Sequence, residues 1–283
     1  MADVPAPKSF AALTQTSLRI KLVDIGANPI EGDPPYASLL AEGSADVVGF
    51  EPNPEALAKL DKIKGPHERY LPHAVGDGGR HTLRFCQAPG MTSLLEPNPA
   101  VLNLFHGFPD WGKVLSTEEI DTVRLDDIPE TEGIEYIKID IQGGELMALS
   151  NAENRLKSTL VIQTEVEFMP MYVGQPLFSE MEMFLRGHGF MLHRFFPAVT
   201  RMVKPLMMGG DMYAGLNQLL WADAVFVRDL TRLDVLSDVQ LLKMAKILHD
   251  CYQAIDLAFN LLTEYDRRNQ TGLAGGYLNG LKS

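Results

Sequence analysis

Several apolar runs end abruptly in glycines or acidic residues, and these runs predict the strands of a sheet. Ile20–Ile25 is followed by Gly26, and Asp46–Phe50 is followed by Glu51. Nearly continuous hydrophobic runs of this length are typical of parallel strands that are covered on both faces. The remaining strands are expected at 69–75, 81–86, 120–125, 135–141, 159–167, 190–196 and 219–227.

Helical patterns between these runs predict an α/β fold. Pro54 suits the first turn of a helix, and Gly189 suits the position after a helix end. Helices are expected at 36–42, 54–63, 145–156 and 178–188. Strands that alternate with helices form mostly parallel sheets. An exception is expected where 69–75 and 81–86 flank the turn Gly76–Gly79, because this spacing predicts an antiparallel hairpin.

A long amphipathic helix is expected after the last strand. Ser237 and Gln240 have the spacing of a capping box, and apolar residues recur with a heptad-like period over Leu241–Tyr265. A stripe this wide must be buried, either against its own domain or against the same helix of a second subunit. Because the period suits helix pairs, we predict a homodimer through Leu241–Tyr265.

Two irregular segments interrupt the pattern. Gln87–Glu119 is rich in Pro, Gly and Asn and contains Phe105, Phe108 and Trp111, so it is expected to form a lid with exposed aromatic residues. Pro197–Asn217 is rich in methionine. This composition suits an adaptable apolar wall or core filler beneath a loop, and we favour the filler.

The composition is that of a soluble protein with a well-formed core: 46% of the 283 residues are hydrophobic and 22% are charged. The net charge of -12 and the lack of basic clusters argue against nucleic acid as a partner. We find no signal peptide and no apolar run long enough to cross a membrane. Two distant cysteines make no disulfide framework, so we expect a cytoplasmic protein. The expected divisions are an N-terminal arm (1–17), a main domain (18–230) and a C-terminal helical extension (231–283).

Polar residues lie at the ends of the first two strands, where open α/β sheets bind ligands. Asp24 and Gly26 end the first strand. Glu51 ends the second, where a carboxylate can accept hydrogen bonds from the hydroxyls of a ribose. The loop after Gly26 does not continue the G-x-G-x-x-G pattern, which counts against a nicotinamide dinucleotide as the ligand.

Five motifs follow one another along the chain: Val23–Asn28, Phe50–Asn53, Ala74–Asp77, Val123–Asp127 and Ile137–Glu145. In sequence and order they resemble the FkbM family of S-adenosylmethionine-dependent methyltransferases, over 20–227. The resemblance implies a Rossmann-like sheet of seven, mostly parallel strands and S-adenosylmethionine as the cofactor. It also implies O-methylation of a hydroxyl on a saccharide or natural product.

The resemblance also assigns residues to the cofactor. It implies that Asp24, Gly26 and Asn28 hold the methionine part, that Glu51 holds the ribose, and that Asp77 accepts the adenine amine. Asp77 stands among glycines, and a turn former is an equally good interpretation of it. The other residues that the resemblance places around the cofactor are Ala27, Pro52, Asn53 and Asp140.

Methyl transfer to a hydroxyl needs a group that takes up the proton, or a metal that lowers the pKa of the hydroxyl. Asp140 is the first candidate for the base, because it follows the strand beside the cofactor strand, and Glu165 is the second. Glu165 and Glu167 face one side of their strand, and Glu145 is a further nearby acid, although such acids also cap helices or face water. Gln142 stands where the family usually has Glu, so no base is assigned there. Mg2+ is compatible with the acids, but no clear ligand set supports it, and we assign no metal site.

Two alternatives stay open. One is a non-catalytic protein that binds S-adenosylmethionine or an interaction partner, and the other is a Rossmann enzyme that uses another adenine nucleotide. Binding of S-adenosylhomocysteine rather than NAD would exclude the second alternative, whereas only turnover of an acceptor would exclude the first.

Overall fold

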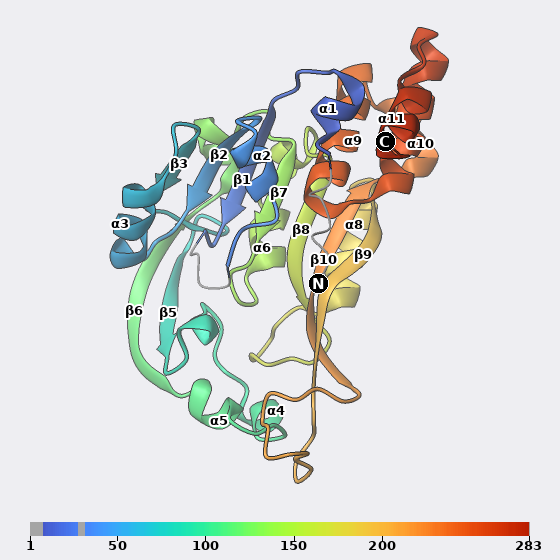
Figure 1. Cartoon of the computed structure of the whole chain (residues 1–283). Helices are drawn as coiled ribbons and strands as arrows, with labels where there is room; N and C mark the ends of the chain where they lie inside the picture. The colour runs from blue at the N-terminus through green and yellow to red at the C-terminus, as the bar shows by residue number, and fades with distance from the viewer. Residues whose placement is uncertain (1–7, 28–31, 283) are drawn as a thin grey trace.

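A seven-stranded sheet is the centre of the computed structural model, which describes residues 8–27 and 32–282 (Figure 1). Six strands run parallel, and the sixth position of the sheet holds an antiparallel strand. The expected Rossmann-like sheet of seven, mostly parallel strands is therefore confirmed. The strands lie in the order β3 (Glu68–Leu71), β2 (Ala45–Phe50), β1 (Ile20–Ile25), β7 (Tyr136–Ile139), β8 (Val161–Glu167), β10 (Gln218–Arg228) and β9 (Phe190–Arg201).

The strand order reverses between β1 and β7. The chain moves outward from β1 to β2 and β3 on one side, and β7 and β8 extend the sheet on the other. In the register, Asp24 of β1 lies opposite Lys138 of β7. Open α/β sheets bind ligands at the carboxyl ends of the strands beside such a switch point. The residues predicted for the ligand site are therefore at the edge where a ligand is expected.

Helices cover both faces of this sheet and make two cores. Successive strand residues alternate between the cores, as Leu22 and Val23 do. One layer holds α6 (Glu145–Ser150), α7 (Glu153–Leu156) and α8 (Phe178–Gly187), and the other holds α1 (Phe10–Thr14), α2 (Ala37–Ala41), α9 (Asp238–Tyr252), α10 (Ile255–Asn269) and α11 (Leu273–Lys282), with α3 (Pro54–Ile63) beside β3. Within the described ranges, no helix has the length and apolarity needed to span a bilayer.

The C-terminal segment contains a helix pair where the sequence predicts one long helix. The capping box at Ser237 is confirmed, but the single long helix is wrong, because Gln253 adopts a left-handed conformation (φ 53°) and α10 turns back onto α9. Leu241 and Leu248 of the apolar stripe are fully buried in the core that the helices share with the sheet of the same chain. The stripe is therefore buried mainly against its own domain, which is the alternative to a helix pair between subunits, and the homodimer through Leu241–Tyr265 stays a prediction.

Burial of this stripe predicts a large effect on stability. Leu248→Ala should lower the free energy of unfolding by about 2–5 kcal/mol, because it leaves a cavity in a closed core. Val239→Ala on the same helix should change it by less than about 0.5 kcal/mol, because Val239 is 55% exposed. Urea unfolding of both variants measures the difference. Equal effects of the two substitutions would contradict the packing of α9 on the sheet.

A second lobe lies beyond the carboxyl edge of the main sheet (Figure 1). Its small sheet has the order β4 (Ala74–Val75), β6 (Val114–Val123) and β5 (Arg80–Cys86). The predicted strand 69–75 is divided near Pro72, which cannot donate a hydrogen bond to a sheet; β3 joins the main sheet and β4 pairs with β6. The predicted hairpin is also wrong, because β5 pairs with β6 across an intervening segment of the lobe.

The second lobe has its own core, which corrects the prediction of exposed aromatic residues. Its short helices are α4 (Pro99–Leu102) and α5 (Phe108–Trp111). Phe105 and Phe108 are only 1% and 2% exposed, and they share a core with Leu220 of β10. Between β9 and β10 the prediction of a methionine-rich core filler is wrong, because Met207, Met208 and Met212 are exposed.

The predicted helix over 145–156 is two short helices, α6 and α7. The interruption falls at Asn151 and Ala152. The carboxylate of Asp126 accepts hydrogen bonds from the N–H groups of Asn154 and Arg155 at 3.0 and 3.1 Å. Asp126 therefore caps α7. Through these hydrogen bonds, the segment before β7 is attached to the helices on this face of the sheet.

Candidate functional site

Asp24 is buried at the end of β1, where it contacts two side chains that the sequence analysis missed. Its Oδ2 accepts a 2.5 Å hydrogen bond from the hydroxyl of Tyr36, and its Oδ1 lies 3.4 Å from Nζ of Lys138. Burial alone would lower the pKa of Lys138, but the carboxylates of Asp24 and Asp140 outweigh burial and raise it. Lys138 is therefore charged and holds Asp24 in place. A lysine inside a strand that is buried on both faces was the available sequence signal.

Gly26 forms the tight bend that the sequence predicts after β1. Its φ is +81°, and a Cβ at this position would lie 2.0 Å from the carbonyl oxygen of Asp140. The N–H groups of Gly26 and Ala27 both donate to the carbonyl of Phe50 at 3.1 Å. This loop is therefore fastened between β2 and β7 at the switch point. Asn28, also predicted here, lies outside the described residues.

Glu51 follows β2 and is buried beside this loop. Its Oε1 accepts a hydrogen bond of 2.8 Å from the N–H of Asn53. Burial raises the pKa of the Glu51 carboxyl, and this hydrogen bond partly opposes the rise. Asn53 itself caps α3, because its Oδ1 accepts from the N–H groups of Glu55 and Ala56. Pro52 lies between Glu51 and Asn53, so the motif Phe50–Asn53 holds the Glu51 carboxylate at the end of β2.

Asp77 acts as a turn former in the second lobe. Its Oδ1 accepts hydrogen bonds from the N–H of Gly79 at 2.8 Å and from the hydroxyl of Thr122 at 3.2 Å, and it lies 2.8 Å from Nε2 of His81. The contact with His81 lowers the pKa of the Asp77 carboxyl, as does the bond from Gly79. The turn interpretation is therefore confirmed, and the contact with adenine stays a prediction.

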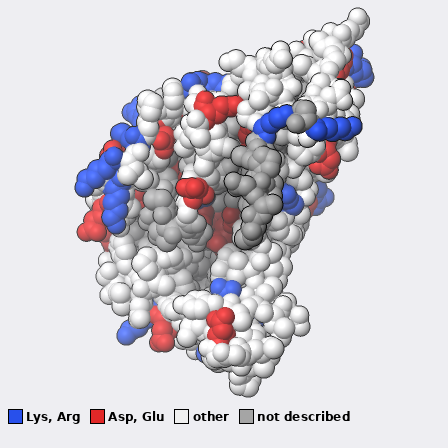
Figure 2. All heavy atoms as spheres, viewed as in Figure 1, with Lys and Arg blue, Asp and Glu red and all other residues white. Residues whose placement is uncertain are grey.

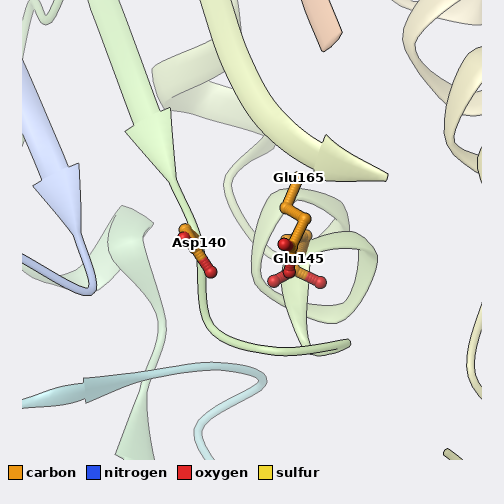
Figure 3. A group of neighbouring side chains, drawn as sticks. All are labelled: Asp140, Glu145 and Glu165. Carbon is orange, nitrogen blue, oxygen red and sulfur yellow. The ribbon is translucent and has the colours of Figure 1, made fainter. Parts of the chain in front are cut away.

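Asp140, Glu145 and Glu165 converge at the carboxyl ends of β7 and β8, and we call these three residues the acid cluster (Figure 3). Each offers a carboxylate oxygen, and these oxygens lie within 4.8 Å of one another. Nε2 of Gln142 donates to Asp140 at 2.9 Å and to Glu165 at 3.0 Å. The structure thus brings together both predicted catalytic residues, and the bridging Gln142 is a role that the sequence analysis missed.

The loop between β7 and α6 holds the acid cluster in shape. Oε1 of Glu145 accepts from the N–H of Ile141 at 2.7 Å, and Oε2 accepts from the N–H of Gly143 at 2.9 Å. Gln142 between them has a left-handed backbone (φ 57°), a strained conformation that is often found at functional sites. Burial and the nearby Asp140 raise the pKa of Glu145 to about 7, although the two backbone bonds oppose this.

Glu165 and Glu167 lie on one face of β8, as predicted, and both are influenced by the acid cluster. Burial, Asp140 and the neighbouring glutamates raise the pKa of Glu165 well above its usual value. Burial also raises that of Glu167, with Glu145 and Asp140 adding to the effect. Asp and Glu side chains appear in the hollow between the main sheet and the second lobe (Figure 2).

Three solved structures align with most of the chain at low identity. Precorrin-6y C5,15-methyltransferase from Geobacter metallireducens GS-15 is 15% identical, with 77% of this chain and 84% of that chain covered and a TM-score of 0.38. M. capricolum TrmK in complex with S-adenosylhomocysteine is 9% identical, with 98% and 99% covered and a TM-score of 0.37. A SAM-dependent methyltransferase from Aquifex aeolicus is 10% identical, with 75% and 85% covered and a TM-score of 0.31. No curated protein matches the chain.

The sequence itself matches a known protein family over most of the main domain. Residues 24–192 match the family described as the methyltransferase FkbM domain. This range is more than half of the chain, and it contains the Asp24–Gly26 strand end, Glu51 and the acid cluster. The expected resemblance is therefore confirmed, and the chain belongs to the FkbM methyltransferase family.

Proposed function

We propose that the protein transfers a methyl group from S-adenosylmethionine to a hydroxyl of a saccharide or other small natural product. The observation that carries this proposal is that two kinds of site meet at the switch point. Gly26 and Glu51 form a loop and a carboxylate suited to the cofactor. Asp140 and Glu165, on the next strands, supply acids suited to an acceptor hydroxyl.

The residues at the ends of β1 and β2 fit S-adenosylmethionine. Oδ1 of Asp24 is buried, and its one close partner among the described residues is Nζ of Lys138 at 3.4 Å, so a lone pair is left to accept from the ammonium of the methionine part. Glu51 is buried at the second strand end, where it can accept hydrogen bonds from the ribose hydroxyls. Side chains of Glu68 and Tyr70, hydrogen-bonded to each other at 2.7 Å, follow on the neighbouring β3.

S-adenosylmethionine supplies an electrophilic methyl group, and the acceptor oxygen must approach it in line. The chain must hold the acceptor hydroxyl and receive its proton. We assign the proton to Asp140, because the Gly26 loop touches the backbone of this residue and the base must be close to the cofactor. Gln142 holds Asp140 and Glu165 together, so Glu165 positions the base and the acceptor.

Binding and turnover test the proposal separately. Calorimetry with the full chain should show binding of S-adenosylhomocysteine and no binding of NAD. Methyl-labelled S-adenosylmethionine and fractionated extracts should then yield a labelled small molecule with a methyl ether. Binding of NAD alone would favour a Rossmann enzyme with another nucleotide. Binding of S-adenosylhomocysteine with no labelled product from any fraction would favour a non-catalytic binding protein.

The ribose assignment predicts a measurable loss of affinity. Glu51→Ala should weaken binding of S-adenosylhomocysteine by about 1–3 kcal/mol, the scale of a lost hydrogen bond to a charged group. Glu55→Ala is a suitable control, because Glu55 is an exposed acid in the first turn of α3. Calorimetry measures both, with circular dichroism to check folding. Unchanged affinity in folded Glu51→Ala would show that this carboxylate does not hold the ribose.

A further inference from the structure

The acid cluster brings three carboxyl groups close together in a partly buried place. Asp140, Glu145 and Glu165 come from three separate elements, and their carboxylates point toward one another (Figure 3). Like charges at this distance repel one another strongly where water is excluded. Such an arrangement persists only if the charge is offset by protons, by hydrogen-bond donors or by a cation.

The donors of the chain offset this charge only in part. Gln142 and the backbone N–H groups of Ile141 and Gly143 are neutral donors. Within the described part of the chain, no Lys, Arg or His forms an ion pair with the acid cluster. The neighbouring Lys138 attracts the carboxylate of Asp140, but the partner within its ion-pair distance is Asp24.

Glu167 gives a second and separate indication of a ligand. This side chain is only 2% exposed, and its Oε1 forms no hydrogen bond of ordinary geometry with the described residues, although the side-chain amide of Gln175 is a neighbouring donor. It lines the same small cavity as Glu145, Glu165 and Gly143. A buried acceptor oxygen without an ordinary hydrogen bond is costly, so its presence beside the carboxylates of Glu145 and Glu165 favours a positive ligand in the cavity.

We propose that the acid cluster binds one hard divalent cation, such as Mg2+ or Mn2+, with Glu167 as a neighbouring fourth acid that shares a cavity with Glu145 and Glu165. The donor set is made of carboxylate oxygens from Asp140, Glu145 and Glu165, without His or Cys, and this is the preference of hard cations. The role of the cation rests on the proposed function: next to an acceptor hydroxyl, it would lower the pKa of that hydroxyl, so that a weak base such as the Asp140 carboxylate can take up the proton.

Binding of Mn2+ to the full chain, treated with EDTA and then dialysed, tests the site without cofactor or acceptor. Electron paramagnetic resonance should show one saturable Mn2+ per chain, and Mg2+ should compete for it. Glu165→Gln should weaken Mn2+ binding by at least about tenfold. The matched control is Glu118→Gln, which changes an exposed glutamate on β6 and should leave binding unchanged.

Three results would overturn the cation site: no saturable binding at millimolar Mn2+, wild-type affinity in Glu165→Gln, or equal weakening in Glu118→Gln. If Glu165→Gln does not fold, Glu167→Gln provides the same comparison. Calorimetry with S-adenosylhomocysteine in EDTA separates this proposal from the methyltransferase function. Cofactor binding without Mn2+ binding would reject the cation alone, and Mn2+ binding without cofactor binding would reject the proposed function alone.

Discussion

Asp140→Asn is expected to lower methyl transfer by a factor of ~10²–10⁴ while cofactor affinity changes little. The substitution keeps the shape of the side chain and an oxygen that can accept from Nε2 of Gln142. It removes the group that we propose receives the proton of the acceptor hydroxyl. The loss should therefore fall on turnover and not on binding of S-adenosylhomocysteine, because the proposed cofactor contacts come mainly from β1 and β2.

The measurement is single-turnover transfer from labelled S-adenosylmethionine to the acceptor found in the extract screen, with calorimetry for the cofactor. Asp121→Asn on β6 is the matched control, since Asp121 is an exposed aspartate of the second lobe. It should keep full activity. Full activity of Asp140→Asn would remove Asp140 from the mechanism, and an equal loss of cofactor affinity would make it a cofactor residue instead.

The main sheet could be predicted from sequence because its central strands are covered on both faces. β1, β2 and β7 are therefore short, mostly apolar runs, and β8 begins with the apolar Val161 and Ile162. The second lobe could not be predicted in the same way. β6 is mostly exposed and pairs with both β4 and β5, so neither its hydrophobic pattern nor its distance along the chain identifies its partners.

A periodic pattern also says that a face is buried without saying what buries it. The stripe from Leu241 onward was correctly expected to be covered, but the left-handed turn at Gln253 has no clear signal in the pattern. This turn brings α10 back along α9, so both helices share the core of the main sheet. The heptad-like spacing was thus compatible with packing inside one chain as well as between two.

At the site, the sequence predicts positions better than it predicts contacts. Acids at strand ends were found because parallel strands end at the same edge. The bridge from Gln142 to Asp140 and Glu165 depends on the left-handed loop after β7, and the ion pair of Lys138 with Asp24 depends on the register of β1 and β7. Both are properties of the assembled sheet, which a linear pattern does not contain.

The second large effect is expected for Gly26→Ala, which should lower the affinity for S-adenosylhomocysteine by more than about 100-fold. Two costs act together. An alanine at φ +81° carries strain of about 1–3 kcal/mol, and its Cβ would lie 2.0 Å from the carbonyl oxygen of Asp140. Backbone atoms cannot yield at that distance, so the loop must move away from β7. The same displacement should lower the free energy of unfolding in urea.

Gly43→Ala separates these two costs. Gly43 also has a positive φ, +69°, but its added Cβ would meet no atom within 4 Å. This control therefore carries the strain of the left-handed backbone without the collision, and it lies before β2, away from the carboxyl edge of the sheet. Gly43→Ala should lose stability and keep cofactor affinity. If the two variants bind S-adenosylhomocysteine equally well, the contact between the Gly26 loop and Asp140 does not shape the cofactor site. If Gly26→Ala alone loses affinity, the close approach of the two backbones is what places the cofactor beside the acids of β7 and β8.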